Sequence, residues 1–444
     1  MSVPKAVRPA FDVIVAPVPP LEGSGRAEPP LPPVPGRGGY SRTVDGVTVT
    51  FAEDPTLGET RPQPLVVPIR KRFTELDGLR GVAALLVVVF HLRDSVRALD
   101  TPEHLYRIIS GANLMVDLFF VLSGFVLART MLSTASVSDA VRFAGLRARR
   151  FMPLHLTGVA IALACVTTIW LAQQSGFHNA PGRSVFTSTK ESPVGWLSAV
   201  LLLQGLIGPQ FAGYAAAWSL SIELWVNILL VGAIAVVPWP NRRQLVGPVA
   251  MVIGGLTLAV LDPKLENSVG LTAFGRGLCG LGTGMVVYWL YTSGIRRGWG
   301  GARLRPPSAQ VRKVRWPTIG AAVGLQALLA SMHWSRDLRP LNFLEVYPIS
   351  ALLLFCLAQP AVGPVHRLMN SRLTQWLGSR SFALYALHAP MLMAVTLGCQ
   401  LNGWHLREPK VAALIIVATL TSSLIAAELG HRFIERLWVP KKSG

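Results

Sequence analysis

The chain has 444 residues, of which 51% are hydrophobic and 15% charged, and its formal net charge is +19. A soluble domain carries about 25% charged residues, so lipid must solvate much of this surface. The basic excess lies in short segments between apolar runs, chiefly 142–150 and 296–315. Such segments are typical of cytoplasmic loops, which argues against a nucleic-acid partner and predicts a helical membrane protein.

Residues 1–72 contain fourteen of the 33 prolines and little apolar periodicity. A segment of this composition cannot bury enough apolar surface to offset its chain entropy, so we expect a disordered, Pro-rich cytoplasmic tail. The alternation of apolar and polar residues over 43–51 leaves a small hairpin open as an alternative. A membrane domain is expected over 73–438, and a short basic tail over 439–444.

Eleven apolar segments follow the tail, each long enough to be considered for crossing a hydrocarbon core of ~30 Å. They are 75–93, 112–130, 153–172, 194–211, 218–237, 245–261, 269–291, 316–333, 342–359, 376–398 and 410–428. If all eleven cross, two large basic clusters fall outside, against the positive-inside rule. If 194–211 lies in the outer interface or enters the membrane without crossing it, all of these clusters are cytoplasmic. We therefore expect an all-α integral membrane protein, a bundle of ten transmembrane helices with both termini cytoplasmic.

The first span carries a cation and an imidazole on one face. An ionisable group within a span costs at least ~2.5 kcal/mol, so each one is a functional candidate. Arg80 and His91 are eleven residues apart, which returns to the same helix face about 16 Å further along the axis. Asp77 lies one turn before Arg80 and can pair with it. The alternative is that Arg80 snorkels and His91 satisfies a polar group at the outer interface.

The second span opens with a carboxylate near the level expected for His91. Asp117 could there orient the imidazole and stabilise its protonated form. A structural hydrogen bond or ion pair is the alternative. Ser123 and Gly124, further along the same span, suit close helix packing better than chemistry.

Two arginines precede the third span. Arg147 and Arg150 are neighbours on a helix surface at i, i+3. They either anchor the loop in the cytoplasm or, together with Arg80, form an anion site suited to bidentate phosphate binding.

The later spans also carry polar groups. Ser219, Glu223 and Asn227 follow i, i+4, i+8 and share one face, just after Trp218. Glu223 is either functional or the structural partner of an intramembrane arginine, for which Arg276 is the candidate. A second stripe at i, i+4, i+7 is expected to line the substrate site or to form structural hydrogen bonds. Its members are Ser381, Tyr385 and His388.

These blocks, in this order, resemble the acyltransferase 3 family of membrane enzymes. The matching blocks are Leu76 to Gly81 with His91, Val116 to Phe120 with Ser123 to Phe125, Arg147-x-x-Arg150-x-x-Pro153, Trp218 to Ser221 with Glu223, and Ser381 to His388. The resemblance implies transfer of an acyl group, often acetyl, from a coenzyme A thioester to a hydroxyl or amine. It implies that Arg80 and His91 are the essential Arg and His of the family, and that Arg147 and Arg150 are its two-arginine motif.

On this basis we expect an acyl-CoA-dependent O-acyltransferase of the inner (cytoplasmic) cell membrane. The donor is expected to be acetyl-CoA in the first place, no metal is expected, and the acceptor is expected to be a carbohydrate or another hydroxyl compound. His91 would act as general base or, in a variant, form an acyl-imidazole, with Asp117 or Glu223 balancing its charge. The residues expected to bind the donor are Arg80, Arg147 and Arg150. Those expected to bind substrate are Trp218, Ser219, Arg276, Tyr385 and His388.

Two other readings stay open. Buried charges in a ten-span protein also describe secondary transporters, although no inverted repeat is visible in this sequence. A catalytically inactive family member that acts as a membrane binding partner is the second. Hydrolysis of acyl-CoA that depends on His91 separates the enzyme from both.

Overall fold

The computed structural model describes most of the chain. The described residues are 39–44, 47–52, 72–132, 134, 136–177, 192–207, 216–236, 245–261, 270–296, 315–334, 342–359, 361 and 363–436. The chain divides into two compact units, Met1–Arg70 with Gly294–Arg303, and Lys71–Ser293 with Leu304–Gly444.

The first unit contains a β-hairpin. Strands β1 (Gly39–Val44) and β2 (Val47–Ala52) pair antiparallel, with Val44 opposite Val47 and Gly39 opposite Ala52. This is the hairpin that the alternation over 43–51 allowed. Most of the expected disordered tail, and the basic tail 439–444, lie outside the described residues, so these expectations stay predictions.

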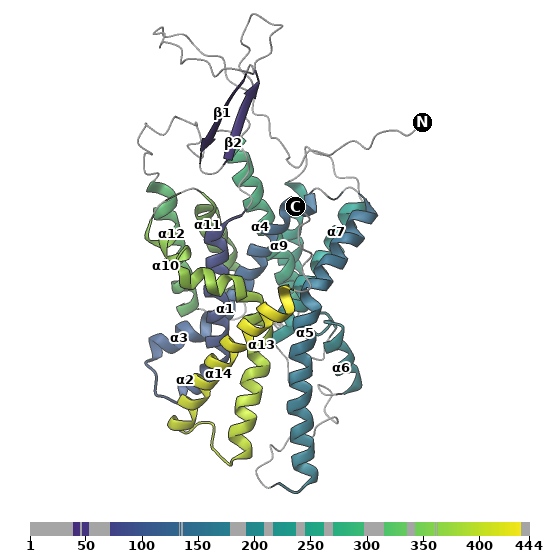
Figure 1. Ribbon diagram of the computed structural model, residues 1–444, viewed down its shortest axis with the longest axis vertical. Coiled ribbons are helices and arrows are strands. Elements are labelled where there is room, and N and C mark those ends of the chain that lie inside the picture. Colours follow the sequence, from purple (N-terminus) through teal and green to yellow (C-terminus); the bar gives the residue numbers. More distant parts are fainter. Residues whose placement is uncertain are drawn as a thin grey trace, which may run out of the picture. The chain divides into compact units, whose positions relative to one another are not determined.

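The described part of the second unit is helical, and α9 runs on by three residues into the first unit. Its elements are α1 (Thr74–His91), α2 (Arg93–Arg97), α3 (Glu103–Gly111), η1 (Ala112–Leu114), α4 (Met115–Leu132), α5 (Val137–Gln174), α6 (Pro193–Val200), α7 (Trp218–Val236), α8 (Val246–Leu261), α9 (Gly270–Arg296), α10 (Arg315–Trp334), α11 (Asn342–Ala358), α12 (Pro364–Met369), α13 (Arg372–Leu401), α14 (Pro409–Gly430) and η4 (His431–Glu435). Figure 1 shows these helices as ribbons, with colours that follow the sequence from purple to yellow.

Each of the ten segments expected to cross the membrane coincides with a helix of 16 residues or more. In the remaining segment, 194–211, the described residues 194–207 form the eight-residue α6 followed by turns. Eight residues rise about 12 Å, too little to cross ~30 Å of hydrocarbon.

Among the described residues, five helical segments are long and apolar enough to cross a membrane by length and composition alone. They are Glu103–Met131, Val137–Gln174, Trp218–Val236, Arg372–Leu401 and Pro409–Glu435. The protein is therefore a multi-pass helical membrane protein, while the count of ten spans and the cytoplasmic termini stay predictions.

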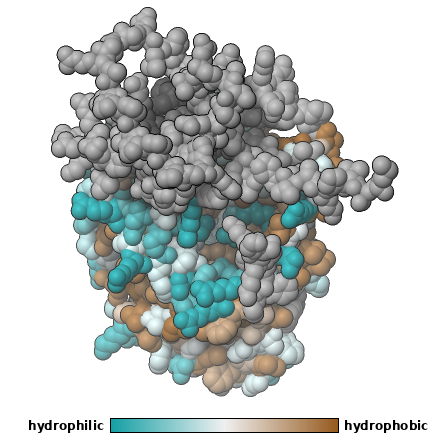
Figure 2. Space-filling model, turned by 45° about the horizontal axis from the view of Figure 1, so that its top comes forward, coloured by the Kyte–Doolittle hydropathy of each residue, from teal (hydrophilic) through white to brown (hydrophobic). Residues whose placement is uncertain are grey.

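The outer surfaces of several helices are apolar. Large exposed hydrophobic side chains include Val126, Ile253, Leu271, Ile319 and Val417. Figure 2 shows hydrophobic patches beside polar residues on one face of the molecule. Exposed apolar area on this scale is expected where lipid, and not water, contacts the helices.

Helices α1 and α13 pack closely against each other along their length. Glycines permit this approach, because a Cβ at Gly81 would collide with the backbone of α13 at Gly378, and a Cβ at Gly378 would collide with the backbone of α1 at Asp77. A Cβ at Gly78 would likewise strike the carbonyl of Met369, at the end of α12. Small residues at the contact allow backbones to approach in membrane helix packing. The α1–α13 pair is the frame on which the polar site is built.

Candidate functional site

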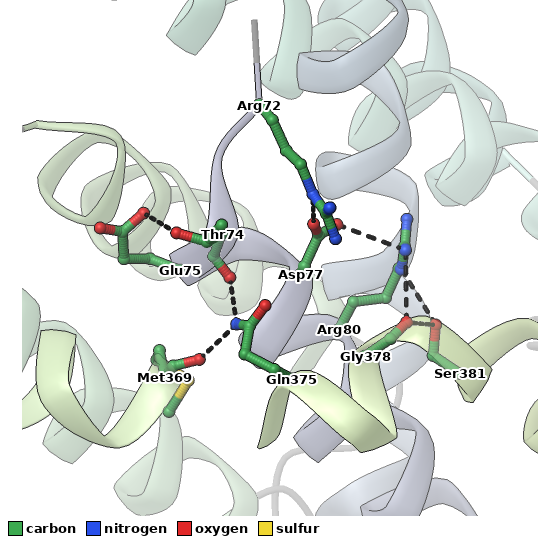
Figure 3. Close-up of polar contacts among 9 residues, drawn as sticks. All are labelled: Arg72, Thr74, Glu75, Asp77, Arg80, Met369, Gln375, Gly378 and Ser381. Atoms are coloured by element: carbon green, nitrogen blue, oxygen red, sulfur yellow. Dashed lines mark hydrogen bonds and ion pairs between the residues drawn. The ribbon is translucent and has the colours of Figure 1, made fainter. Parts of the chain in front are cut away.

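Arg80 is fixed at one end of the α1–α13 pair (Figure 3). Its Nε donates a hydrogen bond to Ser381 Oγ at 3.0 Å, and its Nη2 lies 3.4 Å from both the Gly378 carbonyl and Asp77 Oδ1. Asp77 also accepts a hydrogen bond from Arg72 Nε at 2.8 Å. The expected Asp77–Arg80 pair is therefore present. The Arg80 side chain keeps 30% of its surface exposed, so it is anchored and still accessible to an anion.

His91, the last residue of α1, is fixed against the middle of α13. Its Nδ1 lies 2.9 Å from the Val87 carbonyl and 3.3 Å from Nε2 of His388. The Nδ1 of His388 lies 2.7 Å from the Tyr385 carbonyl. His388 is 1% exposed, whereas His91 is half-buried. The sequence placed His388 in a stripe that lines the substrate site, but gave no sign that it contacts His91.

These two contacts show that α1 and α13 run parallel. Arg80 contacts Ser381, and further along both helices His91 contacts His388. Arg80 and His91 thus face the same neighbouring helix, as their eleven-residue spacing predicted.

Asp117 has a partner different from the one expected. Its carboxylate accepts two hydrogen bonds from Arg276, from Nε at 3.0 Å and from Nη2 at 2.7 Å, and a third from the Tyr347 hydroxyl at 2.9 Å. The Trp218 ring lies 5.0 Å from the Arg276 guanidinium carbon. Asp117 therefore forms the structural ion pair that was its alternative, because a buried cation on α9 needs a counter-ion. It makes no hydrogen bond to His91 among the described residues.

Glu223 pairs with Arg147 and not with Arg276. Its Oε1 accepts a hydrogen bond from Ser123 Oγ at 2.8 Å and one from Arg147 Nη2 at 3.2 Å. Arg147 Nη2 also donates to Ser123 Oγ at 3.1 Å. Three helices, α4, α5 and α7, meet in this cluster. Gly124 packs closely, as predicted, since a Cβ there would strike the Leu281 carbonyl.

Arg80, Arg147 and Arg150 lie close enough to interact electrostatically. Arg147 is buried and Arg150 exposed. Arg147 Nε is buried and has no hydrogen-bond partner within the described part of the chain. Asp77 pairs with Arg80 and Glu223 with Arg147, and Arg150 adds a third cation, an arrangement of guanidinium groups that can bind phosphate.

The polar face of α7 contacts several helices. The hydroxyl groups of Ser219 and Tyr385 share a short hydrogen bond, and the Tyr385 hydroxyl also donates to the Ala216 carbonyl at 3.3 Å. The Phe119 ring packs edge-on against Tyr385. Asn227, one turn beyond Glu223, is fully buried, and neither of its amide atoms has a partner among the described residues.

Comparison with known proteins agrees with this geometry. Residues 73–428 match a family model described as an acyltransferase domain. The chain belongs to the acyltransferase 3 family. This confirms the resemblance seen in the sequence motifs, and the match includes every site residue predicted from the sequence.

Three relatives illustrate the family. "Putative peptidoglycan O-acetyltransferase YrhL" of Bacillus subtilis (strain 168) is 23% identical over 381 residues, 81% of this chain and 54% of its own. "Putative membrane-bound transacylase BcsY" of Komagataeibacter xylinus is 23% identical over 83% of this chain and 85% of its own. "Putative O-acetyltransferase SACOL0978" of Staphylococcus aureus (strain COL) is 22% identical over 81% of this chain and 56% of its own. The chain thus spans about half the length of the first and third. No solved structure gives a significant match.

Family membership and these relatives support a membrane O-acyltransferase. Reasoning from sequence missed two features of this candidate site, the hydrogen bond from the Tyr347 hydroxyl to Asp117 and the contact between His91 and His388. One sign of the hydrogen bond to Asp117 was visible in the sequence, a tyrosine inside the apolar segment 342–359. No three His, Cys, Asp or Glu side chains lie close enough to hold a metal ion in the described ranges, and the expectation of no metal stays a prediction.

Proposed function

We propose that the protein transfers an acyl group, acetyl or another short chain, from acyl-CoA to a hydroxyl of a carbohydrate or of a glycosylated cell-envelope or secondary-metabolite acceptor. The observation that carries this proposal is the α1–α13 pair, in which a cation, Arg80, and a half-buried imidazole, His91, both lie on α1 and contact α13. The names of the relatives, which include a peptidoglycan O-acetyltransferase and a transacylase, support the reaction class.

The donor is proposed to bind by its phosphates at Arg80, Arg147 and Arg150. Guanidinium groups bind phosphate through paired, charge-assisted hydrogen bonds. Arg80 and His91 lie eleven residues apart on α1, about 16 Å along the axis. A pantetheine arm can cover this separation and deliver its thioester close to His91.

His91 is proposed as the general base, a role worth about 10² to 10⁴ in rate. It takes the proton of the acceptor hydroxyl while that oxygen attacks the thioester carbon. The tetrahedral intermediate then expels the coenzyme A thiolate, which receives the proton from the imidazolium. In the variant mechanism His91 itself attacks and carries the acyl group before the acceptor takes it.

The two carboxylates are proposed to act by charge balance. Asp117 holds Arg276, and Glu223 holds Arg147, so each cation is kept in place without contact between a carboxylate and His91. Trp218, which covers Arg276, and the Ser219–Tyr385 pair are proposed to line the acceptor site. The membrane is proposed to be the cytoplasmic (inner) membrane.

The test measures coenzyme A release by protein purified in detergent, using acetyl-CoA and a small panel of other acyl-CoAs with candidate sugar acceptors. We expect His91→Ala to bind acetyl-CoA by calorimetry without turnover, and Arg80→Ala to lose binding. Matched controls are His405→Ala and Arg407→Ala, which change exposed residues in the turn before α14 and should behave as wild type. Turnover by His91→Ala at the wild-type rate would contradict the base assignment. Folded wild type that binds no acyl-CoA would instead favour the transporter alternative.

A further inference from the structure

We infer that His388 is the positioning residue of His91: its ring accepts the Nδ1 hydrogen of His91 and thereby holds the base with its Nε2 lone pair free. The inference rests on the proposed function, because it assigns the residue that orients the proposed base. It goes beyond the sequence, which gave His388 only a place in the substrate lining.

The proton on His388 is fixed by its acceptor. Its Nδ1 lies 2.7 Å from the carbonyl of Tyr385, one turn earlier on α13. A carbonyl oxygen only accepts hydrogen bonds, so Nδ1 must carry the hydrogen. In a neutral imidazole the other nitrogen then has a lone pair, and this nitrogen, Nε2, is the one that faces His91.

The same reasoning fixes the proton on His91. Its Nδ1 has two acceptors within reach, the Val87 carbonyl at 2.9 Å and the His388 Nε2 at 3.3 Å. A lone pair on Nδ1 would oppose both of them, so Nδ1 carries a hydrogen shared between the two. The lone pair of neutral His91 is therefore on Nε2, and no described residue donates a hydrogen bond to this atom. This is the atom that a general base needs free.

The arrangement repeats the logic of a catalytic triad with a neutral third group. In such triads a third side chain accepts the far N–H of the imidazole, selects its tautomer and stabilises the imidazolium. Here the third side chain is the imidazole of His388, which shares the His91 N–H with the Val87 carbonyl, and the carboxylate expected for this role, Asp117, is bound to Arg276. A neutral acceptor also avoids placing another charge within a membrane span. His388 keeps its own hydrogen throughout, since the reaction proton enters and leaves at His91 Nε2.

The packing around His388 supports a positioning role. The side chain is 1% exposed, and its ring lies 4.9 Å from that of His91 and 5.7 Å from that of Tyr385, both edge-on. A ring held on two sides, with one nitrogen bonded to its own helix, has little freedom to turn away from His91.

The test compares His388→Leu, which removes the acceptor, with His388→Gln, whose side-chain oxygen can still accept from His91 Nδ1–H. We expect His388→Leu to lower kcat about 10- to 100-fold, the loss typical when the hydrogen-bond partner that orients a metal-binding histidine is removed, with KM for acetyl-CoA unchanged. His388→Gln should recover most of the rate. The control is His366→Leu, which removes another buried histidine, one that lies on α12, and should leave kcat near the wild-type value.

Nitrogen NMR of ¹⁵N-histidine-labelled wild type gives a readout that does not depend on activity. The His91 and His388 signals are assigned from their loss in His91→Gln and His388→Gln. Both rings should be protonated at Nδ1 and bare at Nε2, and the His91 N–H signal should shift in His388→Leu and return in His388→Gln. Wild-type His91 protonated at Nε2 would overturn the inference even if His388→Leu failed to fold. Full turnover by His388→Leu would also overturn it while leaving the acyltransferase intact, whereas wild type without turnover would count against the proposed function itself.

Discussion

The two buried ion pairs of the bundle, Arg276–Asp117 and Arg147–Glu223, are built differently. In the first pair, the carboxylate binds two guanidinium nitrogens and the hydroxyl of Tyr347. The Arg276 and Asp117 side chains are 4% and 0% exposed. Both carboxylate oxygens and two of the three guanidinium nitrogens are occupied within the pair.

The second pair is more open. Arg147 and Glu223 are 9% and 19% exposed, and one guanidinium nitrogen makes the bonds to both Glu223 and Ser123. Arg147 Nε has no partner within the described residues, and the cations Arg80 and Arg150 are close by.

This difference separates a pair that holds helices together from one that can serve a ligand. A closed bidentate pair fixes α4 against α9 and has little left to offer to a substrate. In the Arg147–Glu223 pair, where one guanidinium nitrogen makes the bonds, the rest of the Arg147 guanidinium can bind a phosphate together with the two neighbouring cations. Variants of the two pairs test whether the first is structural and the second binds a ligand, beginning with the largest expected effect.

Removing one member of the closed pair should cost the most stability. Asp117→Leu leaves Arg276 buried without a counter-ion, which typically destabilises by about 3–5 kcal/mol. The apparent melting temperature in a single detergent should therefore fall more than for any other variant named here. The double variant Asp117→Leu/Arg276→Met removes both charges and should regain much of the loss, because well-packed apolar pairs replace buried ion pairs at little cost. If the single and double variants had the same melting temperature, the charge pair would not be what holds α4 against α9.

Changing the open pair should weaken donor binding more than stability. Arg147→Lys keeps the charge opposite Glu223 but loses the planar guanidinium that binds phosphate through two bonds. Loss of one charge-assisted hydrogen bond, about 1.5–3 kcal/mol, predicts about 10- to 100-fold weaker acetyl-CoA binding by calorimetry. Arg142→Lys is the matched control, since Arg142 is exposed on the same helix. A variant with wild-type affinity and a lower melting temperature would make Arg147 purely structural.

The helices could be predicted from sequence because their signal is local. Ten apolar segments coincide with helices, and the described part of the segment set aside, 194–211, contains a helix of eight residues. Hydrophobic length and periodicity are properties of one segment at a time. The spacing of Arg80 and His91 likewise predicted that the two residues lie on the same helix face, since both belong to one helix.

The partners of the charged groups could not be predicted, because they depend on how the helices are packed. From the sequence, Asp117 could have oriented His91 or formed a structural ion pair, and Glu223 could have balanced His91 or paired with Arg276, and sequence spacing does not choose between these possibilities. The packing of α4 against α9 brings Asp117 to Arg276, and the packing of α7 against α5 brings Glu223 to Arg147. The His91–His388 contact was missed for the same reason, since the two residues are 297 positions apart in the sequence.

The smallest effect is expected for Tyr347→Phe, which removes one hydrogen bond from the closed pair and no charge. Asp117 keeps both bonds to Arg276, so the loss should be about 0.5–1.5 kcal/mol, the usual net worth of one hydrogen bond. It should appear as a slightly lower melting temperature, with acetyl-CoA affinity and kcat equal to those of wild type. A tenfold fall in kcat at unchanged melting temperature would instead place the Asp117–Arg276 pair in the reaction path. The two ion pairs would then both serve the substrate, and burial and bond count would not distinguish a structural pair from a functional one in this bundle.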